Sequence, residues 1–385
     1  MLSRLLKTPN NSFFLFGPRG TGKTTWVKAN FPKSVYLDLL EAELFNVLLA
    51  NPQRLQNYIP RDFQDWIVLD EVQRIPELLN EIHRLIETYK FKFVLTGSSA
   101  RKLRNKGQNL LAGRARTYAF FPLTVPELGD AFDMNRSLQF GHLPSAYLED
   151  DPKKYLESYV KTYLKEEIRQ EGLTRHLGMF ARFLEAASFS QGSVLNIASV
   201  ARECSVERKI VENYFSILED LLIAYRIPAF TKRAKRRIQL HAKFYFFDAG
   251  IYRTIRPKGP LDAPEEIEGI ASETLFLQEL VAINATLELG YTIYYWRTTS
   301  NAEVDFILYG DKGILAFEIK RTARLTQAMF SGLKLFIKDY PTAKACLVYG
   351  GNRRMSEGPI DVVPMEDMLK DLPKLLGGSR QSDAA

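Results

Sequence analysis

The feature that most constrains the fold of this chain is the run Gly-Pro-Arg-Gly-Thr-Gly-Lys-Thr at residues 17–24, which has the G-x-x-x-x-G-K-[ST] pattern in full. A short apolar run precedes it and a helical stretch follows it, which is the context that a phosphate-binding loop requires. The glycines allow backbone N–H groups to face phosphate oxygens, Lys23 neutralises the β- and γ-phosphates, and the Thr24 hydroxyl reaches Mg²⁺. The pattern predicts a strand–loop–helix unit that binds ATP and Mg²⁺.

A second nucleotide motif follows at residues 66–71, Trp-Ile-Val-Leu-Asp-Glu. The apolar run predicts a strand that delivers Asp70 to hold Mg²⁺ through water and Glu71 to polarise the attacking water. The next predicted strand is followed by Thr-Gly-Ser-Ser, where Ser98 can sense the γ-phosphate. The predicted nucleotide-contacting residues are Gly17, Pro18, Arg19, Gly20, Thr21, Gly22, Lys23, Thr24, Thr25, Asp70 and Ser98, of which Thr24 and Asp70 also hold the metal.

Strand-like and helical stretches alternate through the first 150 residues. An amphipathic helix is predicted at residues 78–89, and strands at 13–16, 35–38, 66–69, 91–95 and 115–121. This alternation predicts a parallel α/β sheet.

Arg114 immediately precedes the last of these strands and is a candidate arginine finger. A finger stabilises transition-state charge, often at the site of an adjacent subunit, so this reading predicts a homo-oligomer. The alternative is that Arg114 is a surface charge or part of an interdomain pair.

The character of the sequence changes near residue 150, where Asp151-Pro152 predicts the N-cap and first residue of a helix. Residues 151–225 are predicted to be helical, and residues 193–225 to form a winged helix-turn-helix. In this interpretation residues 201–205 form the turn, and Ser205 caps the second helix. The first helix would carry Val194, Leu195, Ile197 and Val200, and the second would bury Val211, Phe215, Leu218 and Leu222.

Positive charge is concentrated next to this helical segment. The whole sequence has a net charge of +7, and residues 227–258 hold nine basic residues and the single acid Asp248. We expect DNA contact here, although winged helices also bind proteins and surface charge also serves solubility. The predicted DNA-contacting residues are Arg208 and Lys209 on the second helix, and Lys232, Arg233, Lys235, Arg236 and Arg237 on the wing.

Beyond residue 264 the sequence predicts an α-β-β-β-α-β order, with helices at residues 267–289 and 326–339 and strands at 291–296, 303–309, 314–319 and 344–349. Strand alternation places Glu318 and Lys320 on one face, and Asp305 lies near the start of the preceding strand. Two carboxylates that bind Mg²⁺ and a lysine that orients or activates water suit metal-dependent phosphodiester cleavage. Glu273, on the helix before, is a candidate further metal ligand. The alternative is a solvated or salt-bridged sheet face.

Composition bears on membrane contact, on disulfides and on the expected cellular location of the chain. No apolar stretch reaches the roughly 18 residues that a membrane-spanning helix needs, and the amino-terminal residues are too polar for a secretory signal, so no membrane contact is expected. The two cysteines, Cys204 and Cys346, are far apart in sequence and give no disulfide framework. A reducing cytoplasm is therefore the expected location.

Taken together, these motifs resemble a prokaryotic family with an N-terminal AAA+ ATPase domain, a winged-helix region and a C-terminal domain related to PD-(D/E)XK nucleases. Further stretches that carry the resemblance are Leu111-Ala-Gly-Arg114, Pro122-Leu-Thr-Val-Pro-Glu127, Lys243-Phe-Tyr-Phe-Phe-Asp248, Glu279-Leu280 and Glu303-Val-Asp305-Phe306. The resemblance implies an α/β multidomain fold. Its parts would be a P-loop AAA+ parallel sheet at residues 1–150, a helical and winged-helix domain at 151–262 and a PD-(D/E)XK nuclease-like α/β domain at 263–376, followed by a disordered tail at 377–385.

Two functions remain open at this level. The first is an ATP-hydrolysing enzyme that binds and remodels DNA; branched or forked DNA is the expected substrate, since the nuclease relatives include junction resolvases, and cleavage is left undecided. The second is a nucleotide-dependent switch whose winged-helix and C-terminal domains bind a protein partner.

Overall fold

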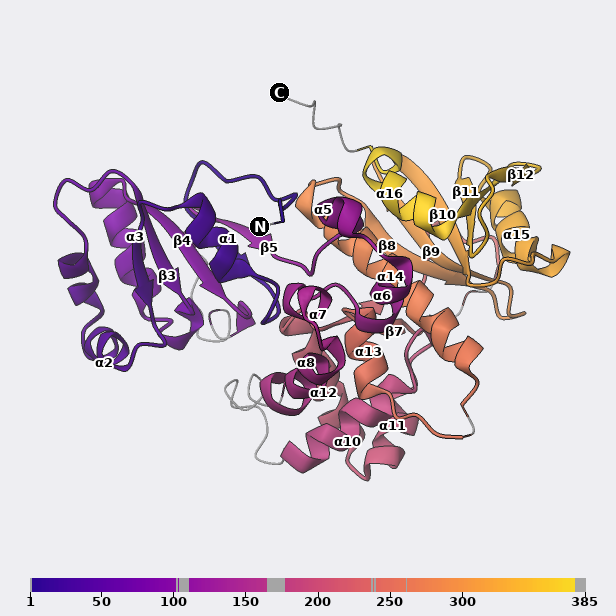
Figure 1. The fold of residues 1–385 in the computed structure, drawn as a ribbon, viewed down its shortest axis with the longest axis horizontal. Helices are drawn as coiled ribbons and strands as arrows, with labels where there is room; N and C mark the ends of the chain where they lie inside the picture. Colours follow the sequence, from indigo (N-terminus) through magenta and orange to yellow (C-terminus); the bar gives the residue numbers. More distant parts are fainter. Residues whose placement is uncertain are drawn as a thin grey trace. The chain divides into compact units, whose positions relative to one another are not determined.

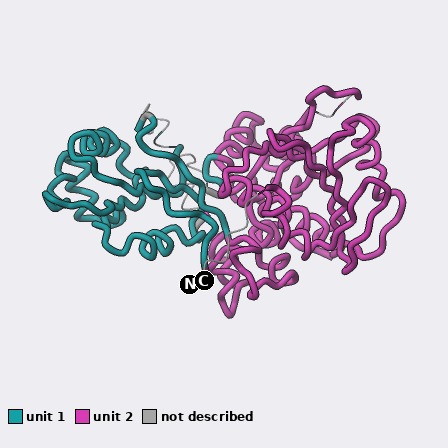
Figure 2. The backbone as a smooth tube through the Cα atoms, turned by 90° about the horizontal axis from the view of Figure 1, so that it is seen from above, with its two compact units in different colours: residues 1, 3–122, 220–222 teal, residues 2, 123–219, 223–385 magenta. Residues whose placement is uncertain are grey.

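The computed structural model describes residues 2–101, 103, 111–164, 177–236, 238, 240–260 and 262–377. The chain forms two compact units, residues 3–122 with 220–222 and residues 123–219 with 223–377 (Figure 2). Of the helices within the described ranges, none combines the length and apolarity that a membrane crossing requires.

The first unit is built on a five-stranded parallel sheet (Figure 1). Its strands, in the spatial order β2-β3-β4-β1-β5, are β2 (Val35–Asp38), β3 (Trp66–Asp70), β4 (Lys92–Gly97), β1 (Phe13–Phe16) and β5 (Arg116–Ala119). All five predicted strands are therefore confirmed. The predicted amphipathic helix is also confirmed, as α3 (Leu78–Tyr89).

Alternation along the strands divides the core of this unit between the two faces of the sheet. Phe13 and Leu15 of β1 pack into one cluster with Trp26 of α1 (Lys23–Asn30). Phe14 and Phe16 pack into the other, with residues of α3 and of α2 (Ala42–Ala50). The unit also contains the short 3-10 helices η1 (Pro52–Tyr58), η2 (Val72–Arg74) and η3 (Leu111–Gly113). Helices on both faces of a parallel sheet are the expected α/β arrangement.

The second unit opens with helices and a small two-stranded sheet. Strands β6 (Ala224–Ile227) and β7 (Lys243–Phe246) pair in antiparallel fashion. The helical elements are α5 (Val125–Leu128), η4 (Gly129–Ala131), α6 (Met134–Phe140), α7 (Pro144–Leu148), α8 (Pro152–Ser158), the π-helix η5 (Tyr159–Leu164), α10 (Leu177–Ser188), α11 (Ile197–Cys204), α12 (Arg208–Asp220) and α13 (Ala249–Ile255). The predicted start at Asp151 is confirmed, because its side chain accepts from the Lys154 backbone N–H and Pro152 is the first helical residue.

Three details of the predicted helix-turn-helix are wrong. Helix α11 begins at Ile197, because the Asn196 side chain caps it, and Val194 instead bridges to Lys243. Residues 201–204 remain helical, and Ser205, with φ of 55°, ends α11 rather than capping α12. Leu222, with φ of 60°, lies beyond the end of α12. The buried positions Val211, Phe215 and Leu218 are as predicted.

The rest of the second unit is a six-stranded mixed sheet flanked by helices. Its strands, in spatial order, are β12 (Met355–Glu357), β13 (Ile360–Pro364), β11 (Lys344–Tyr349), β10 (Gly313–Lys320), β9 (Glu303–Gly310) and β8 (Thr292–Arg297). The helices are α14 (Pro264–Thr286), η6 (Gln327–Phe330), α15 (Ser331–Asp339) and α16 (Met365–Leu375). The predicted α-β-β-β-α-β order is confirmed, and β12, β13 and α16 extend it beyond the prediction.

The two faces of this sheet are covered differently. Phe276 of α14 packs its ring 5.2 Å from Phe317 and 6.0 Å from Phe306 on one face. On the other face Phe336 of α15 lies 5.4 Å from Trp296. Residues 303–320 are consequently held rigidly from both sides, which fixes the polar side chains at the ends of β9 and β10.

Candidate functional site

The phosphate loop joins β1 to α1 at the carboxyl edge of the parallel sheet. Gly20 and Gly22 have φ of 81° and 90°, a conformation that favours glycine. A Cβ atom on Gly17 would lie 2.1 Å from the carbonyl oxygen of Phe120, so this position has no room for a side chain. Pro18 and Thr21 are buried, whereas Arg19, Thr24 and Thr25 are exposed.

Lys23 is folded into the loop. Its side chain is only 8% exposed, and its ammonium donates to the carbonyl oxygens of Gly17 at 2.7 Å and Pro18 at 3.1 Å. The Thr21 hydroxyl also donates to Pro18, at 2.9 Å. The loop thus holds a cation, and a bound phosphate group would replace these neutral carbonyl acceptors with anionic oxygens.

Asp70 is the meeting point of three strand ends. One oxygen of its carboxylate accepts from the Thr24 hydroxyl at 3.1 Å and from the Tyr36 hydroxyl, and the other accepts from the Thr96 hydroxyl and from the Glu71 backbone N–H at 3.1 Å. Burial, reinforced by Asp70, raises the pKa of Tyr36 above its ordinary value, so the phenol stays a donor. Thr24 and Asp70, the predicted Mg²⁺ pair, are therefore in direct contact.

Glu71 and Ser98 are linked through a residue that the sequence did not single out. The buried Gln73 donates from its side-chain amide to the Glu71 carboxylate and, at 3.3 Å, to the Ser98 hydroxyl. Glu71 has φ of 60°, which turns its side chain away from the strand direction. Tyr36, Gln73 and Thr96 were missed because their roles depend on neighbours on other strands, although polar residues at strand ends were the available signal.

Arg114 lies at the other edge of the parallel sheet. It precedes β5, whose first residue pairs with the first residue of β1, so it sits at the amino ends of the strands. Its guanidinium pairs with Glu87 near the end of α3. Arg114 is thus separated by the length of the sheet from the phosphate loop of its own chain.

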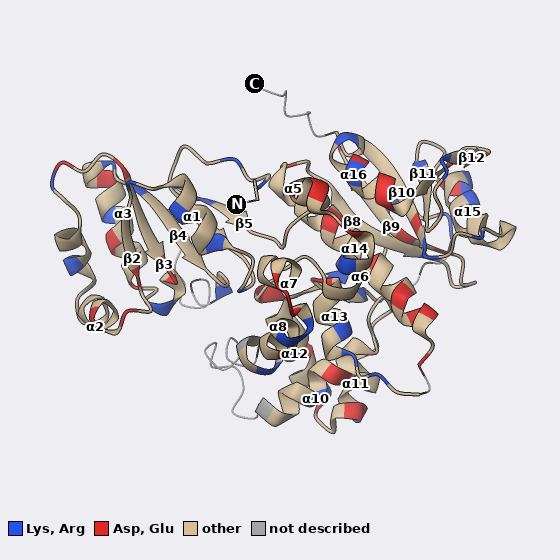
Figure 3. Cartoon of the chain, viewed as in Figure 1, with Lys and Arg blue, Asp and Glu red and all other residues tan. Residues whose placement is uncertain are grey.

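The predicted DNA-contacting residues divide between two exposed segments of the second unit. Arg208 and Lys209 are exposed in the first turn of α12. Lys232, Arg233, Lys235 and Arg236 are exposed in the connection between β6 and β7, and Arg237 lies outside the described residues. Arg236 is paired with Asp339 at 2.7 Å, and the Lys232 ammonium lies 5.2 Å from the centre of the Tyr309 ring. Acidic and basic residues are interspersed along the described elements of both units (Figure 3).

The four residues predicted for the nuclease-like site come together between α14, β9 and β10. Asp305 accepts from the Ile319 backbone N–H at 2.9 Å, and Lys320 donates to Glu318 at 2.6 Å. Glu273 accepts from the Tyr245 hydroxyl at 3.0 Å. Burial, followed by the charge of Asp305, raises the pKa of both Glu273 and Glu318 to about 8.

Lys243, on β7, also enters this carboxylate cluster and was not predicted. Its ammonium pairs with Glu303 and lies 3.5 Å from Asp305. Burial opposes the charged form, but the electrostatic influence of its surroundings, Tyr245 and Asp305 foremost, raises the pKa of Lys243 well above its ordinary value. Within the described ranges, no group of three or more His, Cys, Asp or Glu side chains is arranged to hold a metal ion. The assignment of Glu273, Asp305 and Glu318 as metal ligands stays a prediction.

The phosphate loop and its sheet match a known family. Residues 9–129 match a family model described as an AAA domain. The chain has an AAA domain at its N-terminal end. Residues 131–262 and 268–368 match two models described as domains of unknown function, DUF8612 and DUF4143.

Two relatives that match most of the chain are described only as uncharacterized proteins. An uncharacterized protein of Mycobacterium tuberculosis is 26% identical over 92% of this chain and 80% of its own length. An uncharacterized protein of Haemophilus influenzae is 22% identical over 82% of this chain and 80% of its own length. A crystal structure of a protein from Vibrio cholerae matches at 13% identity and a TM-score of 0.22, over 89% of this chain and 97% of that one, which supports no conclusion.

A second buried ionic contact lies inside the second unit, away from the carboxylate cluster. Glu279 of the DUF4143 domain accepts from the Val125 backbone N–H with both oxygens at 3.0 Å and contacts His142 Nδ1 at 3.1 Å. Burial raises the pKa of Glu279. Because Val125 opens α5, Glu279 satisfies a helix-terminal donor, and we assign this contact to folding rather than to chemistry.

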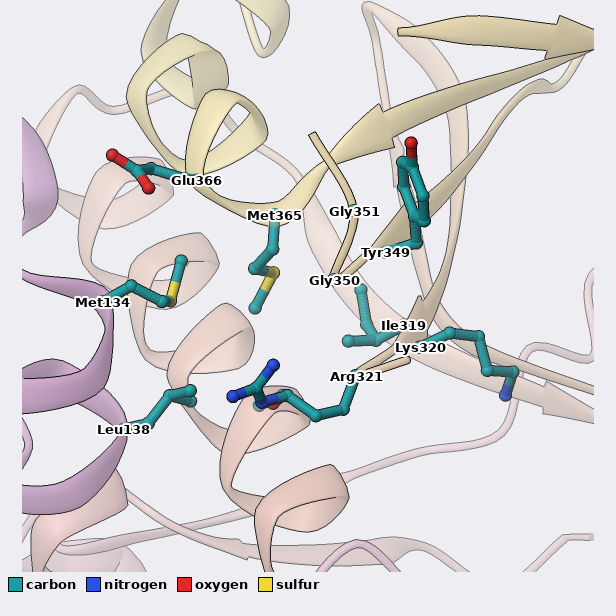
Figure 4. A pocket seen from close by; sticks show the side chains of 11 residues that line it. Met134, Leu138, Ile319, Lys320, Arg321, Tyr349, Gly350, Gly351, Met365 and Glu366 are labelled. Atoms are coloured by element: carbon teal, nitrogen blue, oxygen red, sulfur yellow. The ribbon is translucent and has the colours of Figure 1, made fainter. Parts of the chain in front are cut away.

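A small pocket lies at the carboxyl ends of the parallel strands β10, β11 and β13, with a volume of about 110 Å³. In Figure 4 the Arg321 guanidinium points into it, near Met365 and Leu138, whereas the Lys320 side chain extends away. Lys320 therefore serves the carboxylate cluster and Arg321 the pocket. The pocket lining is mixed, with the charged residues Lys320, Arg321 and Glu366 beside apolar ones such as Met134, Leu138 and Met365.

Proposed function

We propose that this protein is an ATP-hydrolysing AAA protein that binds and remodels DNA, with branched or forked DNA as its substrate. The observation that carries the ATPase part is the contact between Thr24 and Asp70 beside the buried Lys23, at the carboxyl edge of the sheet. The match of residues 9–129 to an AAA domain supports the same activity. The proposed division of the chain is 1–150, 151–262 and 263–376, with a tail at 377–385 of which only Gly377 is among the described residues.

The residues of the AAA domain suggest how hydrolysis would proceed. Lys23 and the loop N–H groups would bind the β- and γ-phosphates, and the Thr24 hydroxyl and Asp70 carboxylate fit a Mg²⁺ ion because they already share one hydrogen bond. The ion would neutralise charge on the transferred phosphate. Glu71 would orient and polarise the attacking water, and Gln73 connects it to Ser98, the predicted γ-phosphate sensor.

The position of Arg114 favours action in an oligomer. A residue at the amino edge of the sheet cannot reach a phosphate at the carboxyl edge of the same sheet, so Arg114 would serve the site of a neighbouring subunit. Its pairing with Glu87 would have to be exchanged for a phosphate contact.

Two observations support a DNA-binding winged helix in the middle of the chain. Helices α11 and α12 are joined by a three-residue turn and are followed by the antiparallel pair β6 and β7, which is the order of helices and wing strands in such a module. Exposed lysines and arginines lie in the first turn of α12 and in the β6–β7 connection, where phosphate contact is expected.

The C-terminal domain is proposed to be nuclease-like in fold and to hold DNA. This relationship is supported by the contact of Lys320 with Glu318, by Asp305 on the adjacent strand, and by the electrostatic influence of Asp305 and Lys320 on Glu273. Cleavage is left out of the proposal because Lys243 already compensates the carboxylates.

The alternative is a nucleotide-dependent switch that binds a protein partner through the same domains. Steady-state ATP turnover with and without duplex, single-stranded and junction DNA separates the two. Stimulation by DNA, strongest for the junction, supports the first function. Turnover that is the same with and without each DNA supports the switch function. Absence of turnover in a folded protein contradicts both functions.

A further inference from the structure

We infer that Lys243 takes the place of a divalent cation in the carboxylate cluster, so that the cluster binds a metal ion only when this lysine is removed. The cluster consists of Glu273, Glu303, Asp305 and Glu318. The inference concerns this cluster alone and does not depend on ATP turnover or on DNA contact.

The Lys243 ammonium lies where a metal ion would have to bind Asp305. It pairs with one oxygen of Glu303 and lies 3.5 Å from Oδ1 of Asp305. The other oxygen of Asp305 is occupied by the Ile319 backbone N–H at 2.9 Å. While Lys243 is present, both carboxylate oxygens of Asp305 therefore contact a hydrogen-bond donor. A Mg²⁺ ion binds its oxygen ligands at about 2.1 Å, so it would have to displace one of these donors to bind Asp305.

The carboxylates supply the oxygen ligands that a divalent cation takes, but with Lys243 in place the described residues are not arranged as a metal site. Asp305 and Glu318 lie on adjacent strands, and Oε2 of Glu318 is buried without a hydrogen-bond partner among the described residues. An orphaned carboxylate oxygen in the interior is costly, and a cation beside it would relieve that cost. Lys243 and a metal ion would therefore compete for Oδ1 of Asp305, and Oε2 of Glu318 would be open to the metal ion alone.

Lys243 is fixed in this position by its own strand. Its backbone pairs with Ile227 on β6 and bridges Val194 on the other side. The neighbouring Ala242 carbonyl accepts from the Leu195 backbone N–H at 2.8 Å. The side chain is only 2% exposed, and its ammonium lies 5.6 Å from the centre of the Tyr295 ring. These contacts hold the ammonium in the buried cluster.

Electrostatics decides against both cations being present together. A divalent ion at Asp305 would lie within a few ångströms of the ammonium, where two like charges in a buried site repel by several kcal/mol at an effective dielectric of about 20. Lys243 lies in the part of the chain that matches DUF8612, and the carboxylates lie in the part that matches DUF4143. The two parts thus share one buried ionic cluster.

The test measures Mn²⁺ binding by the full chain without nucleotide or DNA, using free-Mn²⁺ electron paramagnetic resonance and thermal unfolding. Binding is assigned to the cluster only where Asp305→Asn removes it, which separates it from any ion at Thr24 and Asp70. We expect Lys243→Met to gain Asp305-dependent binding at least about tenfold tighter than in wild type and a higher Tm with Mn²⁺. Wild type and Lys243→Arg, which keeps a positive charge at this position, should show neither Asp305-dependent Mn²⁺ binding nor a rise of Tm with Mn²⁺.

Removal of Lys243 takes the cation from Asp305, while Lys320 stays paired with Glu318 and Arg297 with Glu303, so a second variant guards against loss of folding. Lys243→Met combined with Glu303→Gln removes one positive and one negative charge and keeps the net charge of the cluster. The same gain is expected in this double variant and its loss on adding Asp305→Asn. Asp305-dependent Mn²⁺ binding by wild type would overturn the inference, as would a folded Lys243 variant that gains none. Failure here leaves the proposed ATPase untouched, since that function is read out by turnover.

Discussion

Gln73 donates hydrogen bonds to both the carboxylate of Glu71 and the hydroxyl of Ser98, and so joins the residue that would polarise water to the residue that would sense the γ-phosphate. The contact links η2 to the end of β4 behind the nucleotide site. Through these two hydrogen bonds Gln73 would position Glu71.

The isosteric change Gln73→Glu tests this role. It keeps the volume but replaces the donor by a second carboxylate, which repels Glu71 and favours its protonated form. We expect kcat at neutral pH to fall about tenfold and the limb of the pH–rate profile that reports the base to move to higher pH. The KM for ATP should stay within a factor of about two. An unchanged pH profile would remove Gln73 from the mechanism.

Lys23 and Glu71 should separate binding from hydrolysis. Lys23→Ala removes the buried cation of the loop, so ATP affinity should fall by about 10²-fold or more. Glu71→Gln keeps the loop intact, so nucleotide binding should persist while turnover falls about 10²- to 10⁴-fold. Fluorescent-nucleotide titration and phosphate release measure the two effects. Turnover at the wild-type level in both variants would contradict the ATPase proposal.

Sequence patterns predicted the helices and strands more accurately than they predicted contacts between residues. The five strands of the AAA domain and α3 follow directly from apolar runs and helical spacing, because burial on both faces of the sheet leaves few alternatives. Strand β12 was missed because Met-Ser-Glu is short and polar, whereas β13, Ile-Asp-Val-Val-Pro, has the apolar residues of a strand and was overlooked. Ser205 was misplaced because its capping preference is local, whereas α11 continues to Cys204 and needs a left-handed residue to end.

The carboxylate cluster shows the same limit within a site. Strand alternation predicted Glu318 and Lys320 on one face, and Asp305 was placed beside them from its position on the preceding strand. Lys243 approaches from a strand about sixty residues earlier, and a single lysine in an apolar run carries no signal of an ionic partner. Only pairing of β7 with β6 and contact with β9 reveal its role.

Glu279 should give the stability of the second unit a measurable pH dependence. Burial raises its pKa in the folded state, so the folded chain keeps this proton to higher pH than the unfolded chain does. Stability should therefore fall as pH rises from the ordinary glutamate value of about 4.3 toward the folded pKa. The side chain in Glu279→Gln cannot titrate. In urea unfolding between pH 4.5 and 7, the slope of the unfolding free energy against pH should therefore be shallower in this variant, by an amount that corresponds to at most one proton. A wild-type slope retained in the variant would assign the titration to another group.

Arg114 should act on the nucleotide of a neighbouring subunit. Lys23→Ala retains Arg114 but has a phosphate loop that cannot bind ATP. Arg114→Ala retains an intact phosphate loop but lacks the arginine finger. Each should be inactive alone, and an equimolar mixture should regain part of the wild-type turnover. A mixture of Lys23→Ala and Glu71→Gln is the control, because both defects fall in the same site and no complete site can form. Full activity of Arg114→Ala alone would end the finger assignment.

DNA affinity should depend on the exposed lysine and arginine charges of the β6–β7 connection. Arg236 is held by Asp339, so the informative change is Arg233→Ala with Lys235→Ala, both exposed. If each contacts a phosphate, the double variant should bind duplex DNA more weakly, and the slope of log affinity against log salt should become shallower by about two. Lys153→Ala with Lys154→Ala removes the same charge from the exposed start of α8 and is the matched control. Fluorescence anisotropy across a salt series measures both slopes. Equal losses in the two double variants would mean that net charge alone attracts DNA, and no loss in either would exclude the connection as a phosphate-binding surface.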